Sequence, residues 1–210
     1  MKRFITILAV LSLTTCVLAG NNDVPKMIKV DIGAYQGNNQ KLRAQAYMNP
    51  DSTQLIAIGL EAGYTYPNAR KLARYPYIYI EYTDSLISTL SKVGEKYKEW
   101  SKIAEEHKNG KFTKTIDIEI PFFGLSIYKE GSKNFKIVDA DENKFVMNVY
   151  DENKRPSLVI KHLYKEKYDV DQVIGLVFLD CDEFDQFIDF LKKENIMRRI
   201  KTESIDQLYK

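Results

Sequence analysis

The stretch DSLISTLSKVGEKYKEWSKIAEEHK, residues 84–108, decides how this chain folds. Its apolar side chains recur at spacings of four and three residues, so they form one stripe of a helix; they are Leu86, Leu90, Val93, Tyr97, Trp100 and Ala104. Thr83 or Asp84 can cap the start of this helix, and Asn109-Gly110 marks its end. Gly94 costs the helix about 1 kcal/mol relative to alanine, so tertiary packing has to hold it in place.

Strand-like segments lie on both sides of this helix. Residues 27–32 and 77–82 alternate apolar side chains with others at a period of two, which is typical of strands. Further segments of strand character are 42–48, 55–60, 115–120, 123–127, 135–137, 145–149, 158–164 and 170–179. After the helix they recur about every ten residues with turn residues between them, which indicates an antiparallel meander.

A second helix is predicted over residues 182–195. Its apolar residues follow helical spacing, with Asp182 as the cap and Glu183 in the first turn; they are Phe184, Phe187, Ile188 and Leu191. The tail from Met197 to Lys210 has a weaker pattern and is predicted to be a frayed helix. The sequence therefore predicts an α+β fold: an antiparallel β-meander sheet of five to eight strands, packed on one face by the long helix and the C-terminal helix.

The N-terminus has the features of a secretory signal peptide. Lys2 and Arg3 precede an apolar run from Phe4 to Leu13, and Val17-Leu18-Ala19 fits the small-residue rule for a cleavage site. The run is too short to cross a membrane, which takes about 20 apolar residues. We therefore expect residues 1–19 to be removed. A polar lead-in, residues 20–25, then precedes a single domain over 26–210.

Cys16 offers an alternative processing route. Leu13-Thr14-Thr15-Cys16 resembles a bacterial lipoprotein signal, although such signals usually carry Gly, Ala or Ser where Thr15 stands. Lipidation at Cys16 would tether the protein to a membrane, whereas cleavage after Ala19 would release it. Both routes place the domain outside the cytoplasm: in the periplasm, at the outer-membrane surface or in the extracellular space.

The charge balance argues against nucleic acid as a partner. Removing Lys2 and Arg3 from 31 basic residues leaves 29, which equals the number of acidic residues. Binding to a phosphate backbone needs a surplus of Lys and Arg. The remaining candidates are an unknown protein or a glycan.

The sequence offers no motif for a metal, a cofactor or a catalytic nucleophile. His107 and His162 stand alone, and no Gly-x-Ser-x-Gly elbow or phosphate-binding glycine loop occurs. After cleavage only Cys181 remains; it is expected to be a buried small hydrophobe, although pairing with His162 is conceivable.

Acidic residues give a further set of candidates. Asp139 to Asn143 is rich in oxygen ligands, but Lys144 and Tyr150 occupy the positions where an EF-hand needs Gly and Glu. We predict a polar hairpin turn there and no metal site. Asp117 and Glu119 alternate with isoleucines, as on the wet face of a strand, yet two such carboxylates also have the spacing used by glycosidases.

A tyrosine- and arginine-rich cluster is the best candidate for ligand binding. Tyrosine offers a flat apolar face with a hydroxyl, and arginine offers a planar fork of donors. The predicted ligand-binding residues are Tyr64, Tyr66, Arg70, Arg74 and Tyr75, with Lys71, Tyr77 and Tyr79 nearby. The alternative is that these tyrosines simply pack the sheet, which the alternation at 75, 77 and 79 fits.

The run Lys96-Tyr97-Lys98-Glu99-Trp100, a strand meander, and a C-terminal Asp-Glu-Phe helix at 182–184 together resemble small exported bacterial proteins without assigned function. The resemblance spans residues 84–191. It implies a bacterial envelope context and carries over no catalytic residue.

Three functions are consistent with the sequence. The first is an exported, non-enzymatic binding or structural protein. The second is a hydrolase acting on envelope polymers through carboxylates; the candidates are Asp117, Glu119, Asp139 and Asp141. The third is a subunit of an envelope or secretion assembly, with the Leu86–Ala104 stripe or the tail from Met197 as its interface.

Overall fold

The computed structural model describes residues 27–37, 40–51, 53–61, 77–107, 111–119, 123–128, 135–139, 142–149, 155–164 and 172–208. The helices are α2 (Leu86–His107), α3 (Cys181–Leu191) and α4 (Lys193–Leu208). The strands are β1 (Ile28–Gln36), β2 (Lys41–Met48), β3 (Leu55–Glu61), β4 (Tyr77–Glu81), β5 (Phe112–Ile116), β6 (Phe123–Tyr128), β7 (Phe135–Asp139), β8 (Glu142–Val149), β9 (Ser157–Tyr164) and β10 (Gln172–Phe178). This confirms the predicted α+β class with antiparallel strands, a long helix and a C-terminal helix.

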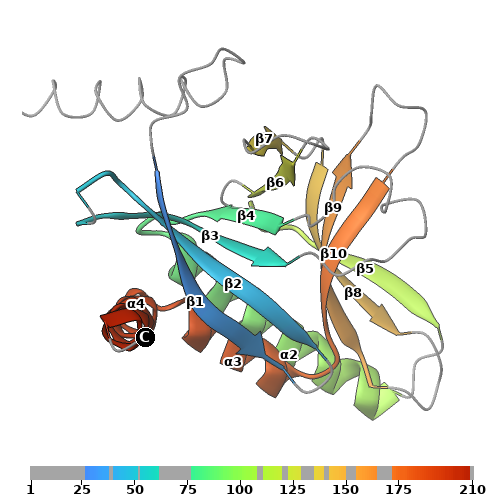
Figure 1. Cartoon of the computed structure of the whole chain (residues 1–210). Helices are drawn as coiled ribbons and strands as arrows, with labels where there is room; N and C mark the ends of the chain where they lie inside the picture. Colours follow the sequence, from blue (N-terminus) through green and yellow to red (C-terminus); the bar gives the residue numbers. More distant parts are fainter. Residues whose placement is uncertain are drawn as a thin grey trace, which may run out of the picture.

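The strands form two sheets, which corrects the expected single sheet of five to eight strands (Figure 1). Sheet 1 has the order β1-β2-β3-β4-β6-β7, and sheet 2 has the order β10-β9-β8-β5. Every pairing is antiparallel. Because β5 joins sheet 2 while β6 and β7 join sheet 1, the chain passes between the sheets three times: from β4 to β5, from β5 to β6 and from β7 to β8. Alternation of side chains predicts a strand, but it does not say which sheet the strand enters.

The helix over 84–108 is confirmed as α2, and it packs against both sheets. On its predicted stripe Leu86, Leu90, Val93 and Tyr97 are fully buried, and Ala104 is 7% exposed. Trp100 departs from the pattern because its side chain is only partly buried. Strand residues of both sheets join the same core cluster; they include Ile58, Ile78 and Ile80 from sheet 1 and Phe145, Leu158 and Phe178 from sheet 2.

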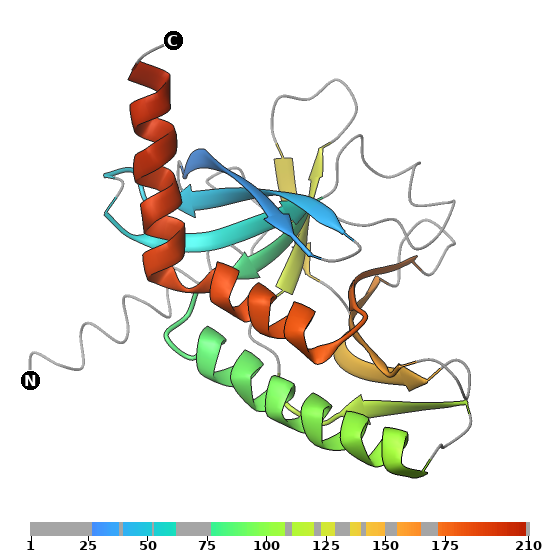
Figure 2. The ribbon, with the colours of Figure 1, turned by 90° about the horizontal axis from the view of Figure 1, so that it is seen from below.

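Helix α3 lies beside α2 (Figure 2) and carries the aromatic contacts that connect the two sheets. The Phe187 ring lies 5.3 Å from that of Tyr35 in sheet 1 and 4.9 Å from that of Phe178 in sheet 2. Phe190 adds a second contact to Tyr35 at 5.6 Å, and Phe184 adds one to Phe178 at 5.0 Å. Such edge and tilted geometries are favourable between aromatic rings. The predicted stripe of α3 is therefore the joint between the sheets.

The start of α3 differs from the prediction. The N-cap is Asp180, not Asp182, and its carboxylate accepts the backbone N–H of Glu183 at 2.7 Å. The Glu183 side chain reaches back in turn, and its Oε2 accepts the Leu179 N–H at 2.9 Å. This is a variant of the capping box, in which two side chains satisfy free donors at the helix start. The cap lies at Asp180 because β10 ends at Phe178 and the helix begins soon after it. The apolar run over residues 170–179 does not show where the strand ends.

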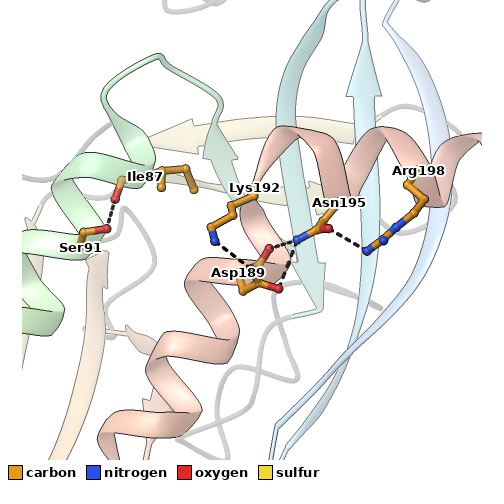
Figure 3. A network of polar contacts seen from close by, with 6 residues as sticks. All are labelled: Ile87, Ser91, Asp189, Lys192, Asn195 and Arg198. Carbon is orange, nitrogen blue, oxygen red and sulfur yellow. Dashed lines mark hydrogen bonds and ion pairs between the residues drawn. The ribbon is translucent and has the colours of Figure 1, made fainter.

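The C-terminal helix also ends earlier than predicted, and a second helix follows it. α3 stops at Leu191, and α4 turns away from it after Lys192 (Figure 2). Asp189 stabilises this corner through two hydrogen bonds (Figure 3). Its carboxylate accepts from Lys192 Nζ at 2.9 Å, and its backbone carbonyl accepts from Asn195 Nδ2 at 2.7 Å. The first half of α4 packs on β1 through Ile196. The tail is therefore helical as far as Leu208.

The β1–β2 hairpin is attached to the β10–α3 junction by polar contacts. The Tyr35 hydroxyl donates to the Glu183 carbonyl at 2.9 Å, and Gln40 Nε2 donates to the Val177 carbonyl at 2.7 Å. Glu183 is fully buried, and its Oε1 has no hydrogen-bond partner among the described residues. That oxygen lies against Gly37, where an added Cβ would come within 2.3 Å of it. The absence of a side chain at Gly37 is therefore a condition for this junction.

Two glycine-to-alanine changes are expected to shift stability in opposite directions. At Gly94 a Cβ would meet Phe184 at 3.4 Å, an ordinary contact, so Gly94→Ala should add about 1 kcal/mol to the free energy of unfolding through helix propensity. Gly37→Ala should lower it by about 1–3 kcal/mol, because the methyl group collides with the buried Glu183 carboxylate. Urea unfolding of both variants measures this, and the same sign for both would contradict the packing described.

Candidate functional site

The predicted ligand-binding cluster lies outside the described residues. Tyr64, Tyr66, Arg70, Arg74 and Tyr75 all fall within residues 62–76, and Cys16 falls within residues 1–26.

One neighbouring tyrosine is described. Tyr79 is 4% exposed, and its ring packs on that of Tyr47 at 5.4 Å on the face of sheet 1 opposite the main core. Of the tyrosines that alternate at 75, 77 and 79, Tyr79 therefore packs the sheet.

Cys181 is part of the packing between α3 and α2. Its side chain is partly buried, and its Sγ lies 3.8 Å from Ser101 Oγ. Burial raises the pKa of the thiol, and Asp185 and Asp180 add to this, while Ser101 and Lys98 act in the opposite direction. Cys181 is therefore a neutral thiol at pH 7, as expected of a structural cysteine.

A Cys181–His162 pair is ruled out by strand register. β9 and β10 pair Leu158 with Phe178 and His162 with Ile174. Cys181 lies three residues beyond Phe178, at the end of the ladder where Phe178 pairs with Leu158. His162 lies four residues from Leu158, toward the other end of the ladder. At about 3.3 Å per residue these positions are far beyond hydrogen-bond reach.

The carboxylates of the hydrolase hypothesis are divided between the two sheets. Asp117 and Glu119 are exposed and follow β5, which ends at Ile116 and not at 120 as predicted. The chain turns there because the Ile118 N–H bonds the Ile116 carbonyl at 3.0 Å. Asp139 ends β7 of sheet 1, and Asp141 lies outside the described residues.

In the described ranges, no three His, Cys, Asp or Glu side chains are grouped so that they could hold a metal ion. No helix among them combines the length and apolar character needed to span a membrane.

The strongest candidate surface is where α2 meets β5, which we call the α2–β5 edge: Lys96, Trp100, Ile103 and residues 111–116. β5 is one of the two outer strands of sheet 2; it pairs with β8 on one side, and no described strand pairs with its other side. An outer strand leaves alternate backbone N–H and C=O groups free to bond another chain. Thr113, Lys114 and Thr115 are exposed along it.

Trp100 lies at the centre of this surface. Its ring is approached by two cations: Lys114 Nζ lies 4.0 Å and Lys96 Nζ 5.5 Å from the ring centroid. Lys96 also pairs with Glu99 at 2.7 Å, whereas Lys114 has no carboxylate partner in the described part of the chain. Ile103, one turn further along α2, is 42% exposed. Cation–π contacts at a partly exposed site contribute on the order of 0.5–1 kcal/mol each.

Sequence reasoning missed this surface for a physical reason. Trp100 fits the apolar stripe of α2, so its spacing predicts a core residue. Lys114 is fourteen positions away in a strand, and no local pattern joins the two. Only the pairing of β5 with β8 brings Lys114 over the indole ring.

Searches of protein families, curated proteins and solved structures each found no match to this chain.

The raised pKa of Cys181 predicts slow alkylation. In the folded mature protein, the rate with iodoacetamide at about pH 8 should be lower than in urea, and should keep rising with pH beyond the ordinary thiol pKa of about 8.5. Mass spectrometry of the alkylated fraction measures the rate. A folded-state rate equal to or above the unfolded one would identify an activated thiol.

Proposed function

We propose that this chain is an exported, non-enzymatic binding protein and that the α2–β5 edge is its binding surface. The observation that carries the proposal is Trp100: a partly buried indole between Lys96 and Lys114, beside a strand whose outer side no described strand pairs with. Tryptophan is among the residues that most often anchor protein interfaces, and charged side chains beside such an anchor contribute to the choice of partner.

The fold makes this surface rigid. Trp100 packs on the core cluster formed by α2 and both sheets, and Phe112 at the start of β5 packs on the same cluster. An anchor whose position is fixed before binding loses little conformational entropy when a partner arrives. The remaining exposed large apolar side chains in the described residues are Ile28 and Leu179, on other parts of the molecule.

The alternatives gain no comparable support. Most of the Leu86–Ala104 stripe, predicted as an interface for an assembly subunit, is buried in the protein's own core; of its members, only Trp100 is partly exposed. For the hydrolase hypothesis, Asp117 and Glu119 are both exposed just beyond the end of β5, and Asp139 ends β7 of the other sheet.

Export is tested by the mass of the mature protein from its native host. A soluble chain beginning at Gly20 supports release after cleavage, and a lipid-modified Cys16 in the membrane fraction supports a tethered form. A chain retaining residues 1–19 in the cytoplasm would contradict export altogether.

Binding at the α2–β5 edge is tested by site-specific photo-crosslinking in living cells. A photoreactive residue at Ile103 should give one discrete product, and the same residue at Leu179 should not, although both side chains are 42% exposed. Trp100→Ala in the Ile103 variant should remove the product, because it deletes the anchor. Equal products from both positions, or none from Ile103, would refute this surface.

A further inference from the structure

We propose that β5 receives an extended, acidic peptide segment of a partner protein, which adds a fifth strand to sheet 2. This deepens the proposed function and rests on it, because it names the partner's chemistry and its mode of binding at the same surface. Adding a strand to a free sheet edge gives affinity through the backbone, and specificity through alternate side chains.

Two other outer strands, β10 and β1, are contacted by side chains or by a helix in the described part of the chain. On β10 the Val177 carbonyl accepts the Gln40 side chain, and the Leu179 N–H beyond it is taken by Glu183. β1, at one end of sheet 1, has α4 packed against it. β5 has no such cover among the described elements, although unprotected edges are a hazard that proteins normally avoid. A retained free edge is explained if it has a partner.

The side chains of β5 define what that partner carries. Residues opposite each other on neighbouring strands share a face of the sheet. A residue opposite Lys114 would therefore lie at the Trp100 ring, where a carboxylate would meet an ammonium group that has no carboxylate partner in the described chain. Residues opposite Phe112 and Ile116 would extend the apolar core. The expected motif is apolar-x-acidic-x-apolar, and exposed Lys111 extends the acidic preference at one end.

A second copy of this chain fits the same edge less well. Antiparallel pairing of β5 with its own copy about its central residue would place two Lys114 side chains opposite each other, which is destabilising. Such a pairing also brings both α2 helices to the same face, next to the same edge. A segment without a helix avoids both problems.

The test uses Trp100, the one tryptophan of the chain, as its reporter. The probe is a nine-residue peptide with blocked ends, in which threonine alternates with valine and glutamate so that Val-Thr-Glu-Thr-Val forms its centre. Titration into the mature protein should change Trp100 fluorescence saturably, and anisotropy of a labelled copy should report the same affinity. Replacing the glutamates of the probe by lysine should weaken binding about tenfold or more.

Backbone methylation of the probe shows whether a strand is added. Alternate N–H groups of a strand point to opposite sides, so only one set can bond β5. Two probes are compared with the parent peptide: one is N-methylated at the odd positions, and the other at the even positions. One of them should lose about tenfold or more in affinity, and the other should keep most of the parent's affinity. Equal affinity for both methylated probes and the parent would overturn strand addition.

Charge at the edge is tested in the protein itself. Lys114→Glu should weaken probe binding about tenfold or more, whereas the matched Lys41→Glu, at an exposed position of sheet 1, should leave it unchanged. Thermal unfolding checks that both variants fold, and Lys111→Glu provides a milder second variant. Equal loss in the Lys41 variant would overturn the assignment to β5.

Other outcomes separate the proposed peptide partner from the proposed binding function of the α2–β5 edge. A Trp100 response to oligogalacturonate but not to the peptide would overturn the peptide and leave the binding surface standing. A concentration-dependent dimer that is seen in sedimentation and abolished by Lys114→Glu would also overturn the peptide and leave the binding surface standing. No response to the peptide overturns the inference, and if Ile103 also gives no crosslink, the proposed function fails with it.

Discussion

The aromatic contacts of α3 hold the two sheets together. Phe187 contacts Tyr35 of sheet 1 and Phe178 of sheet 2 at once, and it is fully buried. β1 and β10, which carry these partners, are the outer strands of their sheets, so the sheets meet where α3 begins and not through strand pairing. The hydrogen bonds from Tyr35 and Gln40 to the β10–α3 segment lie at the same joint. A rigid joint there fixes where every other element lies.

The position of the α2–β5 edge follows from that joint. α3 occupies one side of α2, with Phe184 and Ile188 lying against Gly94. α2 therefore packs its stripe into the space between α3 and the sheets. Trp100, on the same stripe, is only partly buried and lies next to Lys114 of β5, an outer strand of sheet 2. The indole is both anchored in the core and open on one side, which is the arrangement that a binding anchor needs.

Local patterns predicted most of the secondary structure because they report local physics. Apart from Trp100, the stripe of α2 was predicted correctly, and so were the apolar positions of α3, since a helix that buries one face must repeat at 3.6 residues. The boundaries were less well predicted. Asp180 and Asp182 are equally good caps by residue type, and only the end of β10 decides between them. The β5 strand was placed three residues late, because the isoleucines at 116, 118 and 120 continue an alternation that the turn at Ile118 breaks.

The sequence by itself determined the α+β class, the two packed helices and the interpretation of Cys181 as a structural thiol, because composition and periodicity carry that information. The expected tyrosine and arginine site lies in residues 62–76, outside the described ranges. Tertiary structure alone decided that there are two sheets, that β5 is an outer strand and that Lys114 lies over Trp100. Strand partners are chosen by long-range pairing, and residues fourteen positions apart share no local pattern. A surface made by such pairing becomes visible only when the chain is folded.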